Sequence, residues 1–147
     1  MNLPQILQTP KYGWSYLLVH PATRISYIDP MPNYFLNTFI ESLKEKKDFD
    51  IEMDAEGYFY HIISENLENI IIETHMDDIE RNYIPISYEY FIRAAINDIE
   101  IDIEDWKTFD CSLDMDEDGK LVEECVEKNK QSILANIEEI KNLLVEI

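Results

Sequence analysis

The residues with the clearest chemical potential in this sequence are the carboxylates between Asp98 and Asp118. Ten acids and one base, Lys107, give that segment a net charge of −9, out of −19 for the chain. Like charges at this density repel one another, and a cationic partner would relieve that repulsion. We therefore predict a partner-binding ridge made of Asp98, Glu100, Asp102, Glu104, Asp105, Trp106, Asp110, Asp114, Asp116, Glu117 and Asp118.

Within the ridge, the segment from Asp114 to Gly119 matches the first half of a calcium loop. Oxygens stand at positions 1, 3 and 5, and glycine at position 6 permits the sharp turn. Position 12 should be a bidentate glutamate, but Cys125 stands there. The sequence thus predicts an acidic turn and no metal site, with weak calcium binding left open.

Other residue types that carry chemistry form no known motif. His61 and His75 lie on neighbouring predicted strands and could face each other, but a transition-metal site needs further convergent ligands. Three glycines cannot build a phosphate-binding loop, and no nucleophile elbow is present. We expect a protein that is not an enzyme and uses no cofactor. Cys111 and Cys125 form no CxxC pair, so we expect two thiols, with a disulfide between them left open.

The composition favours one folded domain over residues 1–147 and a protein partner. Hydrophobic residues make up 46% of the chain, which suits a buried core. With 31 acids against 12 bases, direct binding to nucleic acid or to anionic lipid is disfavoured. We find no secretory signal and no run of the ~20 apolar residues that a membrane span needs. The expected location is the cytoplasm.

The elements that must position these residues follow from hydrophobic periodicity and turn residues. A β-hairpin is expected over residues 12–29, and three further strands are expected at 49–53, 58–64 and 69–75, followed by a charged connection over 77–85. The apolar runs at 62–63 and 70–72 predict a sheet that is covered on both faces.

Helical spacing predicts the remaining elements. Helices are expected at 32–46, from 87 to about 105, and from about 121 to the end. For the second helix, the alternative is an end near residue 97 and a short strand over 99–103. Together these elements predict an α+β fold in which an antiparallel sheet of about five strands packs against three helices, the last of them long.

In size, acidity and the order of its strands and helices, the chain resembles bacterial immunity proteins of contact-dependent inhibition and polymorphic toxin systems. The resemblance implies that it binds and neutralises a cognate basic toxin, such as a nuclease whose cleft is basic because it must bind phosphates. The alternative is an acidic DNA mimic or adaptor that binds a host nucleic-acid-binding protein.

Overall fold

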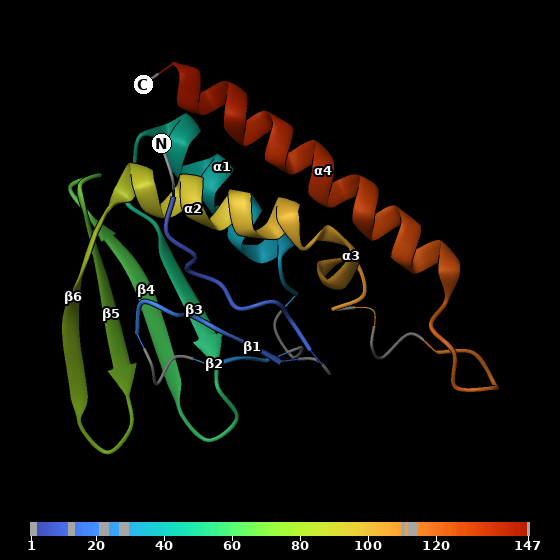
Figure 1. Cartoon of the computed structure of the whole chain (residues 1–147). Helices are drawn as coiled ribbons and strands as arrows, with labels where there is room; N and C mark the ends of the chain where they lie inside the picture. Colours follow the sequence, from blue (N-terminus) through green and yellow to red (C-terminus); the bar gives the residue numbers. More distant parts are fainter. Residues whose placement is uncertain are drawn as a thin grey trace.

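Strands dominate the first half of this chain and helices the second. A computed structural model describes residues 3–11, 14–20, 24–26, 30–109, 111 and 115–146 (Figure 1). In chain order its elements are β1 (Trp14–Tyr16), β2 (Arg24–Ser26), α1 (Asn33–Glu45), β3 (Asp50–Asp54), β4 (Phe59–Glu65), β5 (Asn69–His75), β6 (Ile79–Ser87), α2 (Tyr88–Ile101), α3 (Ile103–Trp106) and α4 (Glu123–Val145). The predicted α+β class with a long C-terminal helix is confirmed.

The main sheet is antiparallel, with the strand order β3-β4-β5-β6. Because side chains alternate across a strand, every second residue points toward the core. Ile51, Tyr60 and Ile72 are among these inward residues, and each is at most 1% exposed. The β4–β5 turn is held by Asp48, whose carboxylate accepts hydrogen bonds from the backbone N–H groups of Asn66 and Leu67 at 2.9 and 2.8 Å.

The predicted charged connection over residues 77–85 is wrong, because β6 occupies most of that segment. Glu80, Arg81 and Pro85 led to the error, since charges and proline are rare in central strands. They are common in edge strands, where one side of the backbone faces solvent. β6 is the strand at one end of the sheet order and suits these residues.

The predicted N-terminal hairpin is confirmed in the described residues, where β1 and β2 pair antiparallel with Ser15 opposite Ile25. It forms its own two-stranded sheet, so the main sheet has four strands where about five were expected. Side chains join the two sheets. The Arg24 guanidinium donates to the Ala55 carbonyl at 3.0 Å, and the Tyr60 hydroxyl donates to the Arg24 carbonyl at 2.7 Å.

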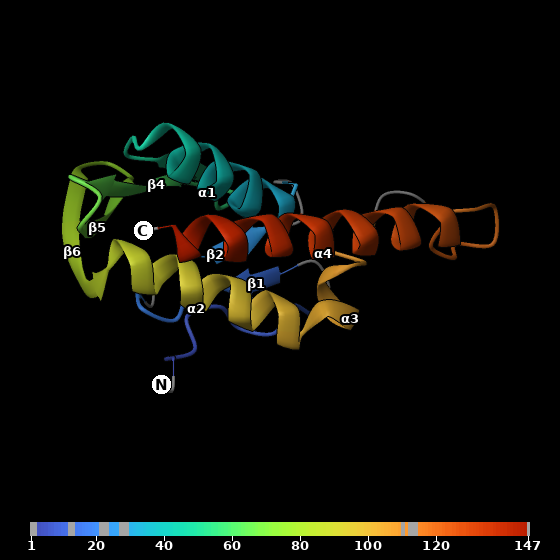
Figure 2. The ribbon, with the colours of Figure 1, turned by 90° about the horizontal axis from the view of Figure 1, so that it is seen from above.

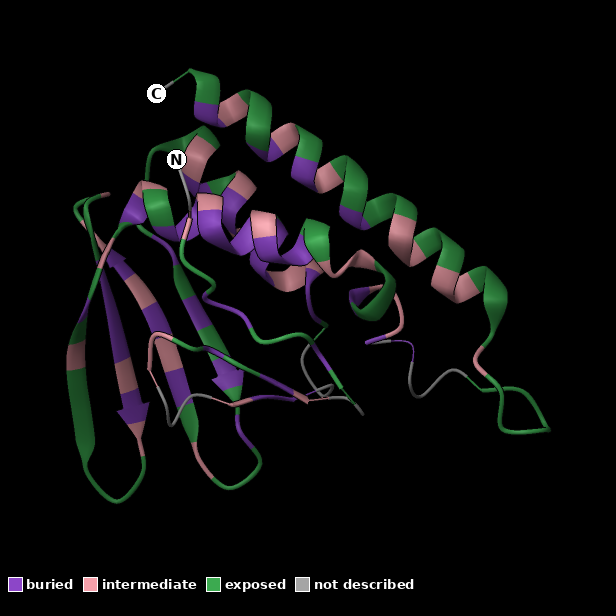
Figure 3. Ribbon diagram, viewed as in Figure 1, coloured by how far each residue is buried: buried purple, intermediate pink, exposed green. Residues whose placement is uncertain are grey.

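Helices α1 and α2 cover one face of the main sheet, and α4 lies across them on the side away from it (Figures 1 and 2). The buried stripe of each helix faces inward (Figure 3).

Ser87 accepts a hydrogen bond from the Tyr90 N–H at 3.3 Å and begins α2. The chain stays helical from Tyr88 to Ile101 and again in the single turn of α3, so the alternative strand over 99–103 is wrong. In the described part of the chain, none of these helices is long and apolar enough to span a bilayer.

Candidate partner-binding surface

Two residues of the predicted ridge lie inside the protein and cannot contact a partner. Trp106 is fully buried and packs against Phe109, with ring centroids 5.1 Å apart. Asp98 is 6% exposed, and its Oδ2 atom accepts hydrogen bonds from the backbone N–H groups of Ile6 and Leu7. Both side chains turn toward the core, Asp98 from α2 and Trp106 from α3, and a count of charges along the sequence does not reveal this.

Three further acids of the ridge are engaged within the molecule. Glu100 pairs with Lys141 of α4 at 2.9 Å. Glu104 pairs with Lys107 at 2.5 Å and with Lys130 of α4 at 3.4 Å, and the hydrogen bond from Lys107 is the main reason that the pKa of Glu104 lies below its ordinary value. Asp102 accepts a hydrogen bond from the Thr9 hydroxyl at 2.7 Å.

The remaining acids of the ridge do not continue its surface. Asp105, Glu117 and Asp118 are exposed. Asp116 closes its own turn, because its Oδ1 atom accepts from the backbone N–H groups of Asp118 and Lys120 at 3.0 and 2.9 Å. That turn lies at the end of the molecule opposite the main sheet (Figure 1). Asp110 and Asp114 lie outside the described residues. The ridge is therefore not one open acidic surface.

A second surface combines acids with exposed apolar side chains, on the face of the main sheet that looks away from the helices. We call it the outer sheet face. The strand registers place side chains in three rows across it. The rows are Asp54, Phe59, His75 and Ile79; Glu52, His61, Glu73 and Arg81; and Asp50, Ile63, Ile71 and Tyr83.

On the two inner strands of the outer sheet face, β4 and β5, three rings pack together. Phe59 stacks on His75 with ring centroids 4.6 Å apart, and the centroids of His61 and His75 are 5.2 Å apart. The expectation that the two histidines face each other is thus correct. Each has a carboxylate neighbour on this face, since His61 Nδ1 lies 2.6 Å from Asp50 and His75 Nε2 lies 2.6 Å from Glu73.

Electrostatically, the region around this face is also strongly acidic, with its charge spread over more residues than in the predicted ridge. Residues 48–82 contain eleven acids and a single base, Arg81, for a net charge of −10 with histidines neutral. The hydrogen bond from His75 is the largest influence on the pKa of Glu73, which lies below its ordinary value, and Arg81 at 2.7 Å also lowers it. The carboxylate of Glu65 accepts a hydrogen bond from the Tyr83 hydroxyl and thereby raises the pKa of Tyr83.

Large apolar side chains stand among these acids and reach solvent. Phe59 is 40% exposed, Tyr83 61% and Ile79 64%. Ile71 on the same face is buried but lies apart from the main core, whose members come from the other face of the sheet. The expectation of a sheet covered on both faces is therefore wrong. The apolar run at 70–72 arises because Ile71 is buried on the outer sheet face, where its partners in register are Ile63 and Tyr83.

The sequence contained a signal for this surface. Strict alternation in the expected strands 49–53 and 58–64 places Glu52 and His61 on the face opposite Ile51 and Ile62. The register between strands was needed to join them into one patch, and the strand that contributes Tyr83 was not predicted. Without that strand, Ile79 and Tyr83 could not be placed on the same face as Phe59.

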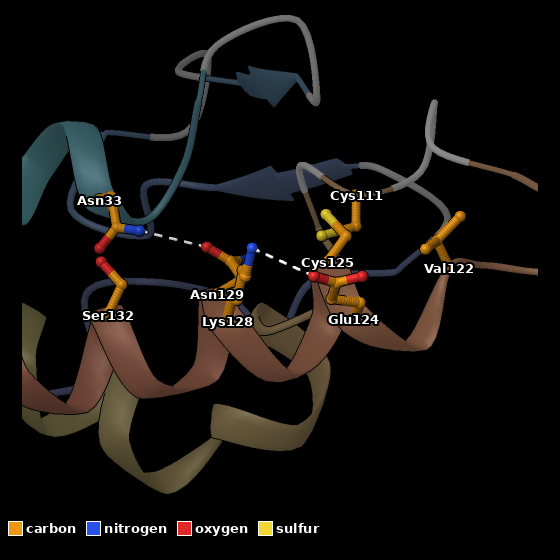
Figure 4. A pocket seen from close by; sticks show the side chains of 8 residues that line it. All are labelled: Asn33, Cys111, Val122, Glu124, Cys125, Lys128, Asn129 and Ser132. Atoms are coloured by element: carbon orange, nitrogen blue, oxygen red, sulfur yellow. Dashed lines mark hydrogen bonds and ion pairs between the residues drawn. The ribbon is translucent and has the colours of Figure 1, made fainter.

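Among the described residues, no group of three or more His, Cys, Asp or Glu side chains could hold a metal ion. Asp114, the first residue of the calcium-loop pattern, lies outside those residues. A separate cavity of about 600 Å³ lies beside the first turns of α4 and is lined in part by Cys111 and Cys125. Their side chains point toward each other (Figure 4), and neither forms a disulfide. The Lys128–Glu124 ion pair, at 3.2 Å, lies at the same cavity.

The outer sheet face is the stronger candidate for a binding surface, because it joins apolar anchors and carboxylates on one exposed face. The cysteine cavity contains no comparable set of acids. No family model, curated protein or solved structure matches this chain, so its function has to be inferred from the geometry of this face.

Proposed function

We propose that this protein acts by binding, as an immunity protein that neutralises a basic protein toxin through its outer sheet face. The observation that carries the proposal is the arrangement of exposed Phe59, Ile79 and Tyr83 among carboxylates on one open sheet. Aromatic side chains supply most of the binding energy at many protein interfaces, and a charged surround selects the partner and speeds association.

The sign of the charge points to the class of partner. A net charge of −19 repels nucleic acid and anionic lipid, and it attracts a protein whose own surface is positive. A nuclease toxin has such a surface, because its cleft must hold phosphates. Occupying that cleft, or the surface beside it, would block the substrate without any chemistry on the part of the inhibitor.

The test co-expresses this chain in bacteria with the protein encoded by the adjacent gene. We expect the neighbouring protein alone to stop growth, the pair to grow, and the two purified proteins to form a complex. Glu52→Lys and Tyr83→Ala should each weaken the complex by at least about ten-fold, since a reversed charge and a lost anchor each cost more than ~1.4 kcal/mol.

The matched control is Glu117→Lys, which makes the same charge change in the turn at the opposite end of the molecule. It should leave the dissociation rate unchanged. Equal effects of Glu52→Lys and Glu117→Lys would show that total charge alone matters and would overturn the assigned surface. Binding to many host nucleic-acid-binding proteins, with no protection against a toxin, would favour the alternative of a DNA mimic.

A further inference from the structure

A cavity at the edge of the outer sheet face combines aromatic rings with carboxylates. Its volume is about 580 Å³, and its lining residues come from α1, β3, the β3–β4 turn and β4. They are Tyr34, Glu52, Asp54, Gly57, Tyr58 and Phe59. Glu52, Asp54 and Phe59 also belong to the outer sheet face, so the cavity is continuous with the proposed interface.

Backbone geometry fixes the positions of these side chains. The Glu52 N–H points away from β4 and donates to the Tyr34 hydroxyl at 3.0 Å, which holds the ring at the free edge of β3. Gly57 has φ = 134°, a conformation that side-chain-bearing residues rarely adopt, and it completes the turn that brings Tyr58 beside β3. The Asp54 carboxylate accepts from the Glu56 N–H at 2.7 Å and is held in that turn.

The same corner of the fold already binds a cation from within the chain. The Arg24 guanidinium carbon lies 5.3 Å from the centroid of the Tyr58 ring and 5.6 Å from that of Trp14. Its charge is outweighed locally by Glu52, Asp54 and Glu56. A second cation that enters the cavity therefore meets a net negative potential and a lining that contains the rings of Tyr34, Tyr58 and Phe59.

We infer that this cavity binds an arginine side chain of a protein partner. A planar guanidinium stacks on aromatic rings, pairs with carboxylates through its fork of N–H donors, and is more weakly hydrated than an ammonium group. The inference rests on the proposed function for the identity of the partner. The arginine site itself can be tested on the free protein.

The test titrates ¹⁵N-labelled protein with the peptide acetyl-Gly-Arg-Gly-amide at about 0.15 M salt, where long-range attraction is screened. We expect saturable NMR shifts at the backbone amides of Glu52, Gly57 and Phe59. Matched peptides carry citrulline, which keeps the shape without the charge, or lysine, which keeps the charge without the plane. Both should bind about ten-fold more weakly, a difference of ~1.4 kcal/mol.

Two variants and one matched control examine the site from the protein side. Glu52→Gln should weaken arginine binding, whereas Glu117→Gln, the same change at the far end, should not. Phe59→Leu keeps an apolar side chain without the ring and should also weaken arginine binding. Shifts spread evenly over all acidic regions, lysine binding as tight as arginine binding, or equal effects of the two glutamine variants would each overturn the inference.

The two proposals can fail separately. If the peptide binds at this cavity and no toxin is neutralised, the arginine site stands and the immunity function falls. If a toxin is neutralised while the peptide shows no localised binding, the function stands and the cavity is not its arginine site.

Discussion

The Oδ2 atom of Asp98 lies 2.7 Å from the backbone nitrogen of Ile6, a residue 92 positions away in the sequence. The same oxygen accepts from Leu7 N–H at 3.0 Å, so one carboxylate on α2 ties down the N-terminal segment. That segment in turn pairs with the hairpin, because the Ile6 carbonyl accepts from the Leu18 N–H at 2.7 Å. Asp98 therefore has a structural role, in the middle of a segment that its charge pattern assigned to binding.

Removing the Asp98 carboxylate should destabilise the fold. Asp98→Ala leaves two buried backbone N–H groups without acceptors, and an unsatisfied buried group costs about 1–3 kcal/mol. We expect a loss of about 2–4 kcal/mol in the free energy of unfolding, measured by urea denaturation. Asp98→Asn retains an acceptor oxygen and should lose less. Equal stabilities of the alanine variant and the wild type would contradict this role.

The stability difference between wild type and Asp98→Asn should depend on pH. Burial raises the pKa of the Asp98 carboxyl above its ordinary value, although the hydrogen bonds from Leu7 and Ile6 lower it in part. Between the unfolded pKa and this higher folded pKa, the native state binds more protons than the unfolded state. The free energy of unfolding of the wild type therefore falls, relative to that of the asparagine variant, as the pH rises through that window. The asparagine side chain has no titrating group at this position. Parallel stability curves of the two proteins across that window would contradict the prediction.

Trp106 should tolerate a change to phenylalanine far better than a change to alanine. The side chain is fully buried, and its Nε1–H has no hydrogen-bond partner among the described residues. Trp106→Phe removes that unpaired donor, which offsets part of the lost packing, so we expect a cost below about 1.5 kcal/mol. Trp106→Ala should cost about 3–5 kcal/mol. Thermal unfolding measures both variants. A phenylalanine variant that unfolds at as low a temperature as the alanine variant would contradict this prediction.

Much of the fold was predictable because local pattern and tertiary environment agree. The stripe of Ile133, Ile137, Ile140 and Leu144 predicted α4, and all four residues are buried. Strand β6 was missed because its exposed edge permits the charges and the proline that argue against a strand in sequence. For the candidate site, the density of charge could be counted from the sequence, but the residues that pair with each charge could not be predicted. The ion pair between Glu100 and Lys141 joins two helices whose contact depends on the whole fold.

The two cysteines should differ in reactivity. Cys111 is 1% exposed, whereas Cys125 is half-buried and stands in the first turn of α4. Iodoacetamide should therefore label Cys125 in the Cys111→Ser variant several-fold faster than Cys111 in Cys125→Ser, measured by mass spectrometry of the intact protein. Equal rates in the two folded variants would show that exposure does not control access to the cavity.

Helix α4 offers a matched pair that separates core packing from surface charge. Ile137 is 1% exposed in the core, whereas Lys141, one turn later, is 44% exposed in its pair with Glu100. Ile137→Ala should cost about 2–5 kcal/mol, because it leaves a cavity between α4 and the helices beneath it. Lys141→Ala should cost at most about 1 kcal/mol, and less at high salt, because an exposed ion pair gains little over hydrated charges. Urea denaturation at low and high salt measures both. A larger loss at Lys141 than at Ile137 would mean that the pairs between α2 and α4, and not the apolar stripe, hold the last helix in place.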